Sequence, residues 1–192
     1  MSCAAVFLDR DGTINMEVDH LTDPAYLQLL PGSARAIKML NDAGIPVIVI
    51  SNQAGIARGL FTEETLGIIN DRLVSMLEVE GAKIDGMYYC PHHPEFGNDV
   101  YKKVCQCRKP SPGMLLNAAD DLDIELTRSY MVGDTKNDIL AGKAAGCRTI
   151  LVRTGYGEAE MLVMGDTADG PDLVCKDIRE AVLHILKELG RM

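Results

Sequence analysis

The sequence predicts an α/β protein built on a doubly wound (Rossmann-like) parallel sheet, and three observations lead to that prediction. Short runs rich in valine and isoleucine alternate along the chain with segments of helical period. The run at 45–51 is almost wholly apolar, as expected for a strand of a parallel sheet that is covered on both faces. Strands and helices also follow one another without a linker-like segment, which is typical of consecutive βαβ units.

Each element of this alternation can be assigned to a stretch of sequence. The expected strands are residues 6–9, 45–51, 84–89, 129–134 and 148–152, with a weaker sixth strand at 172–175. The expected helices are residues 33–44, 62–81, 111–122, 137–146 and 178–190. Ser33, Thr62 and Ser111 are expected N-caps, because a hydroxyl oxygen can accept a hydrogen bond from the first helical turn. We expect one domain, 1–192, because the chain is long enough for a single core.

Composition and charge exclude several classes of protein. The formal net charge of −9 argues against nucleic acid as the main partner, because a phosphate backbone needs a basic surface. No apolar run approaches the length of a membrane span, and Asp9 interrupts the first apolar run too early for a signal peptide. We therefore expect a cytoplasmic protein without a membrane partner, and a monomer, since no exposed apolar stripe stands out.

Polar residues stand where the expected strands end. The first strand ends in Asp9, the second in Ser51 and Asn52, and the fourth in Asp134. In an open parallel sheet the ligand site lies outside the carboxyl ends of the strands, so these side chains should converge on one edge. This convergence is hard to explain by packing and indicates an active site.

The residue pair Asp9 and Asp11 suits covalent phosphoryl transfer. Asp9 could attack phosphorus as a nucleophile, and Asp11 could act as the general acid and base. Because anion attacks anion, a hard cation such as Mg²⁺ is needed, with Asp9, Asp134 and the backbone carbonyl of Asp11 as its expected ligands. Asp138, four residues after Asp134, is expected to support that loop without binding the metal.

Two further groups would complete such a site. The hydroxyl of Ser51 can donate a hydrogen bond to the transferring phosphoryl group, and Lys109 in "CRKPSPG" can supply positive charge to the same oxygens. Arg108, beside it, could bind a more remote part of the substrate. We expect Mg²⁺ and Lys109 together to relieve the repulsion between Asp9 and Asp11.

Three of the six cysteines fall within a short segment, 90–107, that also contains two adjacent histidines. Cys90, His92, Cys105 and Cys107 form two closely spaced pairs, which can supply four soft ligands to one tetrahedral ion. With all four positions filled by protein, a zinc ion there would be structural. The pattern leaves two alternatives open, namely free core thiols and His93 in place of His92.

"DRDGT", "SNQ", the lysine of "CRKP" and "GDTKND" occur in this order at successive strand ends. Together they resemble the four motifs of the haloacid dehalogenase (HAD) superfamily. The resemblance implies the HAD type of fold and a Mg²⁺-dependent phosphatase. The segments between the motifs are too short for a separate cap domain, so loops, including the zinc-binding loop, should shape the pocket.

Within that superfamily the chain resembles the heptose 1,7-bisphosphate 7-phosphatases over residues 4–157, through "SNQAGIARGLFTEE" and "CPHHPE…CQCRKPSPGM". This resemblance implies a sugar bisphosphate as substrate, release of its 7-phosphate, and zinc on the Cys, His, Cys, Cys set. The residues expected to contact substrate are Glu17, His20, Ser51, Asn52, Gln53, Arg58, Arg108 and Lys109. Arg58 could touch a distal phosphate, although an exposed arginine without a function would fit its position nearly as well.

Two other functions remain to be weighed. Histidinol-phosphate phosphatases carry a similar zinc loop, but theirs is shorter between the ligand pairs and their second motif lacks "GIARG". A zinc-stabilised sugar-phosphate binding protein without catalytic activity would belong to another class, and the complete set of catalytic residues here argues against it.

Overall fold

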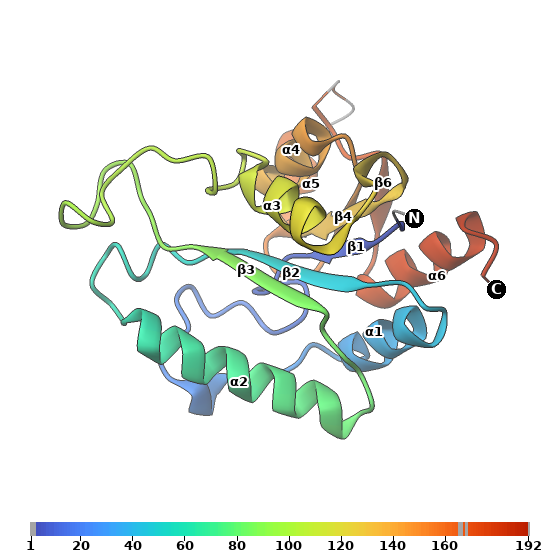
Figure 1. The fold of residues 1–192 in the computed structure, drawn as a ribbon, viewed down its shortest axis with the longest axis horizontal. Coiled ribbons are helices and arrows are strands. Elements are labelled where there is room, and N and C mark those ends of the chain that lie inside the picture. The colour runs from blue at the N-terminus through green and yellow to red at the C-terminus, as the bar shows by residue number, and fades with distance from the viewer. Residues whose placement is uncertain (1–2, 165–166, 168, 192) are drawn as a thin grey trace.

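A computed structural model describes residues 3–164, 167 and 169–191 and contains a six-stranded sheet in the order β3-β2-β1-β4-β5-β6 (Figure 1). All neighbouring strands pair in parallel. The strands are β1 (Val6–Leu8), β2 (Val47–Asn52), β3 (Gly86–Cys90), β4 (Tyr130–Gly133), β5 (Arg148–Val152) and β6 (Leu173–Cys175). The predicted fold class is therefore confirmed, including the weak sixth strand. That residues 1–192 form a single domain stays a prediction.

Helices cover both faces of the sheet, as Figure 1 shows, with α1, α2 and α6 on one face and α3, α4 and α5 on the other. Their bounds are α1 (Ser33–Asp42), α2 (Glu63–Val79), α3 (Gly113–Leu122), α4 (Lys136–Ala145), α5 (Gly157–Met164) and α6 (Ile178–Glu188), with short 3-10 turns at Pro24–Tyr26 and Leu126–Arg128. Helix α5 was not predicted. Its apolar residues Leu162 and Val163 are exposed, so the apolar positions in this segment do not follow the spacing of an amphipathic helix. Among the described residues, no helix combines the length and apolar character that crossing a membrane requires.

Strand side chains alternate between the two faces, and each face has its own core. In β1, Val6 and Leu8 pack with α1, α2 and α6, whereas Phe7 packs with α3 and α4. In β2, Val49 belongs to the same core as Val6 and Leu8, and Ile50 belongs to the same core as Phe7. Because both faces are buried, every residue of β1 is apolar and the strand reads as a continuous hydrophobic run.

Two of the three predicted N-caps are wrong. Thr62 does cap α2, accepting a hydrogen bond from the backbone N–H of Thr65 at 3.1 Å. The cap of α1 is Gly32, whose φ of +82° lets the chain turn into the helix, so Ser33 is already a buried helical residue. Helix α3 begins at Gly113 with Pro112 as its cap, one residue after the position that a Ser111 cap would give.

The start of α3 is set by tertiary packing. The backbone N–H of Gly113 donates to the carbonyl of Gln106 at 2.9 Å, and a Cβ on Gly113 would lie 2.3 Å from that oxygen. The residue that enters this helix must therefore lack a side chain, which local capping preference does not reveal.

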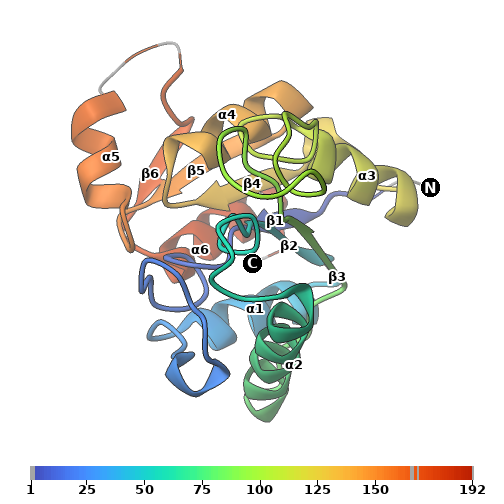
Figure 2. The same ribbon diagram turned by 90° about the vertical axis from the view of Figure 1, so that its left-hand side faces the viewer.

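The direction of winding reverses between β1 and β4. From β1 the chain adds β2 and β3 on one side, and then returns to add β4, β5 and β6 on the other. The carboxyl ends of β1 and β4 therefore flank a topological switch point, the usual place for a ligand in an open sheet. Figure 2 views this end of the molecule, where three segments surround it: residues 9–32, 53–62 and 91–112.

Candidate active site

A pocket of about 240 Å³ lies at the carboxyl ends of β1, β2 and β4. The predicted residues that line it are Asp9, Asp11, Glu17, His20, Ser51, Asn52, Gln53, Arg58, Arg108, Lys109 and Asp134. These side chains come from four separate segments of the chain: 9–20, 51–58, 108–109 and the end of β4. The structure therefore brings these polar groups together at the strand ends, as the sequence predicts.

Lys109 is the buried cation at the centre of the site. Its Nζ lies 2.5 Å from Asp9 Oδ1 and 2.6 Å from Asp138 Oδ1, and it donates to the carbonyl of Ile50 at 2.7 Å. The backbone of Lys109 is held in turn by Asn52, whose side chain accepts from its N–H and donates to its carbonyl, each at 3.0 Å. Burial alone would lower the pKa of Lys109, but the Asp138 and Asp9 carboxylates more than reverse this and raise it.

Asp134 follows β4 directly and presents one oxygen to the pocket without a partner. Its Oδ2 accepts the backbone N–H of Tyr156 at 2.8 Å, whereas its Oδ1 is buried and has no hydrogen bond within the described structure. Gly12 and Gly155 press against the same carboxylate, because a Cβ on either would come within 2.2 Å of Oδ2. The backbone thus fixes Asp134 with Oδ1 left for another ligand.

The site holds more negative charge than Lys109 can balance. Carboxylate oxygens of Asp9, Asp134 and Asp138 lie within 4.8 Å of one another. Burial raises the pKa of Asp9 to about 7, and burial together with the charge of Asp9 raises that of Asp134 to about 9. Full ionisation at neutral pH therefore needs a further cation.

The chemistry of these donors fits Mg²⁺. Hard carboxylate oxygens, one of them unpartnered and buried, suit an ion that binds one or two carboxylates with water and phosphate. Asp9 and Asp134 would hold it, and when bound it would neutralise charge on the substrate phosphate. Both Asp138 oxygens are already engaged, by Lys109 and by Thr135, which favours a supporting role for Asp138. That the backbone carbonyl of Asp11 is a Mg²⁺ ligand stays a prediction.

Asp11 has its own counter-ion, which the sequence analysis missed. Arg10 donates to both of its oxygens, at 3.2 Å from Nε and 2.7 Å from Nη2. Asn15 and Gln53 add hydrogen bonds at 2.9 and 3.0 Å. Burial opposes ionisation, but Arg10 and these two donors lower the pKa of Asp11. The expectation named only Mg²⁺ and Lys109 as the groups that relieve the repulsion between Asp9 and Asp11. Lys109 pairs with Asp9, and Arg10 is the partner of Asp11 that the expectation left out.

Arg10 itself is buried, with only 1% of its surface exposed. Besides Asp11 it reaches α2, where Nη1 donates to the side chain of Asn70 at 3.1 Å. An arginine between two aspartates is a signal in the sequence, because a buried arginine needs carboxylate or amide partners.

The neighbouring strand end provides the other predicted phosphate contact. Ser51 is buried, and its hydroxyl oxygen accepts a hydrogen bond from Gln53 at 2.7 Å, which leaves the hydroxyl hydrogen for a ligand. The same Gln53 amide contacts Asp11, so it links the two side chains. Glu17 lies across the pocket, where burial, and then the charge of Asp11, raise its pKa.

Five residues line the pocket without having been singled out from the sequence: Asp19, Ala54, Thr135, Asn137 and Tyr156. Tyr156 comes from the segment after β5, and Thr154 two residues earlier donates to the carbonyl of Gly12 at 2.6 Å. The end of β5 lies at the same edge of the sheet as Asp134. Residues that follow a strand of a parallel sheet are expected near the ligand, so the segment "RTGYG" after β5 could have been predicted to line the pocket.

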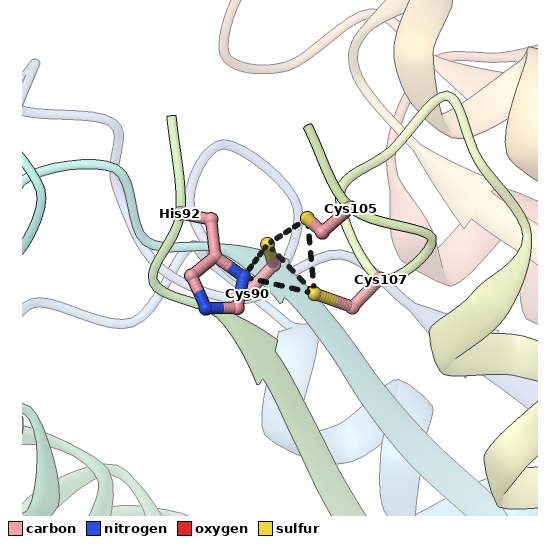
Figure 3. Close-up of side chains that lie close together, drawn as sticks. All are labelled: Cys90, His92, Cys105 and Cys107. Atoms are coloured by element: carbon pink, nitrogen blue, oxygen red, sulfur yellow. Dashed lines mark hydrogen bonds between the residues drawn. The ribbon is translucent and has the colours of Figure 1, made fainter. Parts of the chain in front are cut away.

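The cysteine cluster is formed by the last residue of β3, Cys90, and by the loop that follows the strand (Figure 3). Sulfur atoms of Cys90, Cys105 and Cys107 are 3.1 to 3.5 Å apart, and His92 Nδ1 lies 3.3 Å from the Cys107 sulfur and 3.6 Å from that of Cys90. These separations are too long for disulfides, whose S–S bond is about 2.05 Å. All four donor atoms point to one centre.

This arrangement fits a tetrahedral zinc ion. Bonds of about 2.0–2.3 Å separate tetrahedral ligands by roughly 3.3–3.8 Å, close to the observed spacing. Burial raises the pKa of Cys90, so its thiolate needs a cation beside it. His93, the alternative ligand, turns away, since its Nδ1 accepts from the backbone of Glu95 and Phe96. The side chains that fit a zinc ion are therefore those of Cys90, His92, Cys105 and Cys107.

The cluster also connects to the pocket. Arg108 follows Cys107 directly and donates from Nη1 to the carbonyl of His92 at 3.2 Å. The orientation of this pocket-lining cation therefore depends on the loop that carries the four ligands.

Comparison with known proteins agrees with this geometry. A family model for HAD-hydrolase-like proteins matches residues 106–181. The chain is 41% identical to D-glycero-beta-D-manno-heptose-1,7-bisphosphate 7-phosphatase of Escherichia coli K12, over 94% of this chain and 98% of that one. It is 43% identical to the protein of the same name from Vibrio cholerae, over 87% of this chain and 93% of the relative.

A solved structure is similar over nearly the whole chain. The D,D-heptose 1,7-bisphosphate phosphatase of B. bronchiseptica, complexed with magnesium and phosphate, has a TM-score of 0.86 and 37% sequence identity, covering 96% of this chain and 99% of its own. Identity and coverage of this extent show that the chain belongs to the HAD-like heptose-1,7-bisphosphate 7-phosphatase family.

Proposed function

We propose that this protein is a Mg²⁺-dependent phosphatase that removes the 7-phosphate of D-glycero-D-manno-heptose 1,7-bisphosphate. One observation carries the proposal: at the switch point, Asp9 contacts the Lys109 ammonium and lies close to Asp134, whose Oδ1 has no hydrogen-bond partner among the described residues. A carboxylate placed in this way can attack a phosphate whose charge is neutralised on both sides. The relatives named for the same reaction support the choice of substrate.

In the proposed first step, a carboxylate oxygen of Asp9 bonds to phosphorus and the bond from phosphorus to the C7 oxygen breaks. Asp11 gives a proton to that leaving oxygen, so the sugar departs as an alcohol. Ser51 donates a hydrogen bond to the phosphoryl group, and Lys109 contributes positive charge beside it. The result is an aspartyl-phosphate on Asp9.

In the second step, Asp11 takes a proton from water, whose oxygen attacks phosphorus and releases inorganic phosphate together with free Asp9. The contacts of Asp11 suit this base role, because its pKa is lowered and it is held ionised by Arg10. For the first step Asp11 must carry a proton, so its contacts with Arg10 must weaken when substrate binds. Arg10 thus favours the ionised form of Asp11 that the second step requires.

The distal half of the substrate meets two exposed or half-buried cations. Arg58 and Arg108 line the pocket and suit the phosphate on C1, because guanidinium groups bind phosphate oxygens through several N–H donors. Glu17 and His20 line the same pocket and suit the sugar hydroxyls between the two phosphates. A site built in this way favours a bisphosphate over a substrate with a single charged end.

We also propose that the protein works in the cytoplasm as a monomer. Three cysteines grouped with a histidine as metal ligands, and not paired as a disulfide framework, are typical of a reducing compartment. Elution of the purified protein at the volume expected for 20.9 kDa would agree with a monomer.

The deciding assay is phosphate release with Mg²⁺ from both anomers of the bisphosphate, with histidinol phosphate beside them. Asp9→Asn is the control, because it removes the nucleophile while an amide oxygen can still accept from Lys109. Turnover of the bisphosphate that disappears in Asp9→Asn supports the proposal. Faster turnover of histidinol phosphate would contradict the choice of substrate, and binding without turnover would indicate a sugar-phosphate binding protein.

A further inference from the structure

We propose that Phe96 positions Arg58 for the distal phosphate and thereby helps the enzyme to prefer a bisphosphate. This inference rests on the proposed function. The guanidinium carbon of Arg58 lies 4.0 Å from the centre of the Phe96 ring, close enough for a cation–π contact. Arg58 also lines the pocket, so the stacked group faces the site where the substrate would lie.

The ring of Phe96 is itself held in place. It packs against the His93 ring with centroids 4.8 Å apart, and its backbone N–H donates to His93 Nδ1 at 3.3 Å. His93 is fixed in turn by a backbone hydrogen bond to the carbonyl of Tyr101 at 3.0 Å and by one from Lys103 at 3.1 Å. Phe96 therefore offers Arg58 a supported surface, although 42% of its own area is exposed.

The loop that carries Phe96 lies against the segment that carries Arg58. A Cβ on Gly97, the residue after Phe96, would lie 3.2 Å from the carbonyl of Ala57, the residue before Arg58. In Figures 1 and 2, residues 91–104 and 53–62 lie side by side at the carboxyl ends of the strands. The stack between Phe96 and Arg58 thus joins two loops that meet at the rim of the pocket.

The stack leaves the arginine free to bind an anion. Among the ion pairs and hydrogen bonds of residues 3–164, 167 and 169–191, none engages the Arg58 guanidinium with a carboxylate. An aromatic face contacts the flat side of a guanidinium and uses none of its N–H donors, which all lie in the plane. Phe96 can therefore orient Arg58 without neutralising it, unlike an acidic partner.

The test compares two substrates, the heptose 1,7-bisphosphate and the heptose 7-phosphate, which lacks the distal phosphate. The measured quantity is the ratio of their kcat/KM values. Phe96→Leu keeps an apolar side chain but removes the ring face, and should lower this ratio about two- to fivefold, as expected for an exposed cation–π contact. Phe96→Tyr keeps the ring face and should restore the ratio of the wild type.

Arg58→Gln completes a double-mutant cycle. It should lower the ratio about tenfold or more, because it removes a charged contact to phosphate, and Phe96→Leu should then lower it no further. Tyr26→Leu, which changes an exposed aromatic residue outside this stack, is the matched control. Thermal unfolding and zinc content check that each variant is folded.

Other results of these assays would contradict either the role of Phe96 or the proposed function. Equal losses on both substrates in Phe96→Leu would show a merely structural role and overturn the inference. A further loss when Phe96→Leu is added to Arg58→Gln would show that Phe96 acts through some other residue, and would also overturn it. If the wild-type protein turns over neither substrate, it is the proposed function that fails.

Discussion

The Nζ atom of Lys109 lies 2.5 Å from Oδ1 of Asp9, although the two residues are 100 positions apart in the chain. Both side chains are buried, and Asp138 completes a compact cluster of one ammonium and two carboxylates. Buried charges of this kind are costly unless each finds a partner. Lys109 is therefore expected to contribute both to catalysis and to the stability of the fold.

Replacement of Lys109 by methionine should both inactivate and destabilise the protein. Asp9 and Asp138 would lose their shared partner, and breaking a buried pair typically costs about 3–5 kcal/mol. Urea unfolding in the presence of a chelator for Mg²⁺ measures the loss. Lys102→Met, at an exposed lysine, is the control, and a Lys109→Met variant as stable as this control would contradict the prediction.

Gly155→Ala should weaken the binding of Mg²⁺. Its Cβ would lie 2.1 Å from Oδ2 of Asp134, so this carboxylate must move. Disturbing a residue that orients a metal ligand typically costs about 10- to 100-fold in metal affinity or activity. Titration calorimetry with Mg²⁺ measures the affinity directly, and the Mg²⁺ dependence of turnover should shift with it.

The control for this variant is Gly44→Ala. Gly44 also has a positive φ, +69°, but a Cβ there would meet nothing within 4 Å. Both substitutions carry the backbone cost of a left-handed conformation, roughly 1–2 kcal/mol, and only Gly155→Ala crowds Asp134. Equal Mg²⁺ affinity in the two variants would show that the close approach at Gly155 does not matter.

Asp172 should make folding stability depend on pH in the acid range. It accepts hydrogen bonds from the backbone and hydroxyl of Thr149, at 2.7 and 2.8 Å, and although burial opposes ionisation these bonds lower its pKa. A group with a lowered pKa in the folded state stabilises it above the unfolded value of 3.8, and this contribution disappears as the pH falls through the folded pKa. Asp172→Asn should therefore cost about 1 kcal/mol at neutral pH, and this cost should shrink as the pH falls below 3.8.

Guanidinium unfolding at several pH values, with Asp120→Asn at an exposed position as control, measures that difference. If the cost of Asp172→Asn stays the same at pH 3 and pH 7, the ionised carboxylate is not what stabilises this contact.

The strand ends could be predicted from sequence because they depend on order and periodicity alone. Asp9, Ser51 and Asp134 each follow an apolar run, and parallel strands bring such positions to one edge whatever the packing. The pocket contains all three, as expected. The grouping of the four candidate zinc ligands was predictable for a similar reason, because close spacing leaves the two pairs within reach of each other.

Charge partners and helix starts were not predictable in this way. Arg10 pairs with its own neighbour Asp11, which depends on the side-chain conformations of both residues and on Asn70 from a distant helix. Gly113 begins α3 because Gln106 approaches its backbone closely. Such contacts arise only when the tertiary structure has formed, so local preference for Ser111 as a cap carried no information about them.

Loss of zinc should impair substrate binding more than chemistry. Arg108 depends on the carbonyl of His92 for its orientation, whereas Lys109 is held through Asn52, Asp9 and Asp138, none of which belongs to the zinc loop. Cys105→Ser removes one ligand and should loosen Arg108. We expect KM for the bisphosphate to rise roughly tenfold, the usual cost of a lost charged contact, with a smaller change in kcat.

Steady-state kinetics of Cys105→Ser and of protein stripped of zinc by a chelator test this expectation, with zinc content measured on the same samples. Cys3→Ser is the control, because Cys3 is an exposed cysteine outside the cluster. A collapse of kcat at unchanged KM would place the influence of the cluster on Lys109 instead of Arg108. Restoration of the wild-type KM when zinc is returned to stripped protein, but not to Cys105→Ser, would show that the ion acts by ordering the loop through its four ligands.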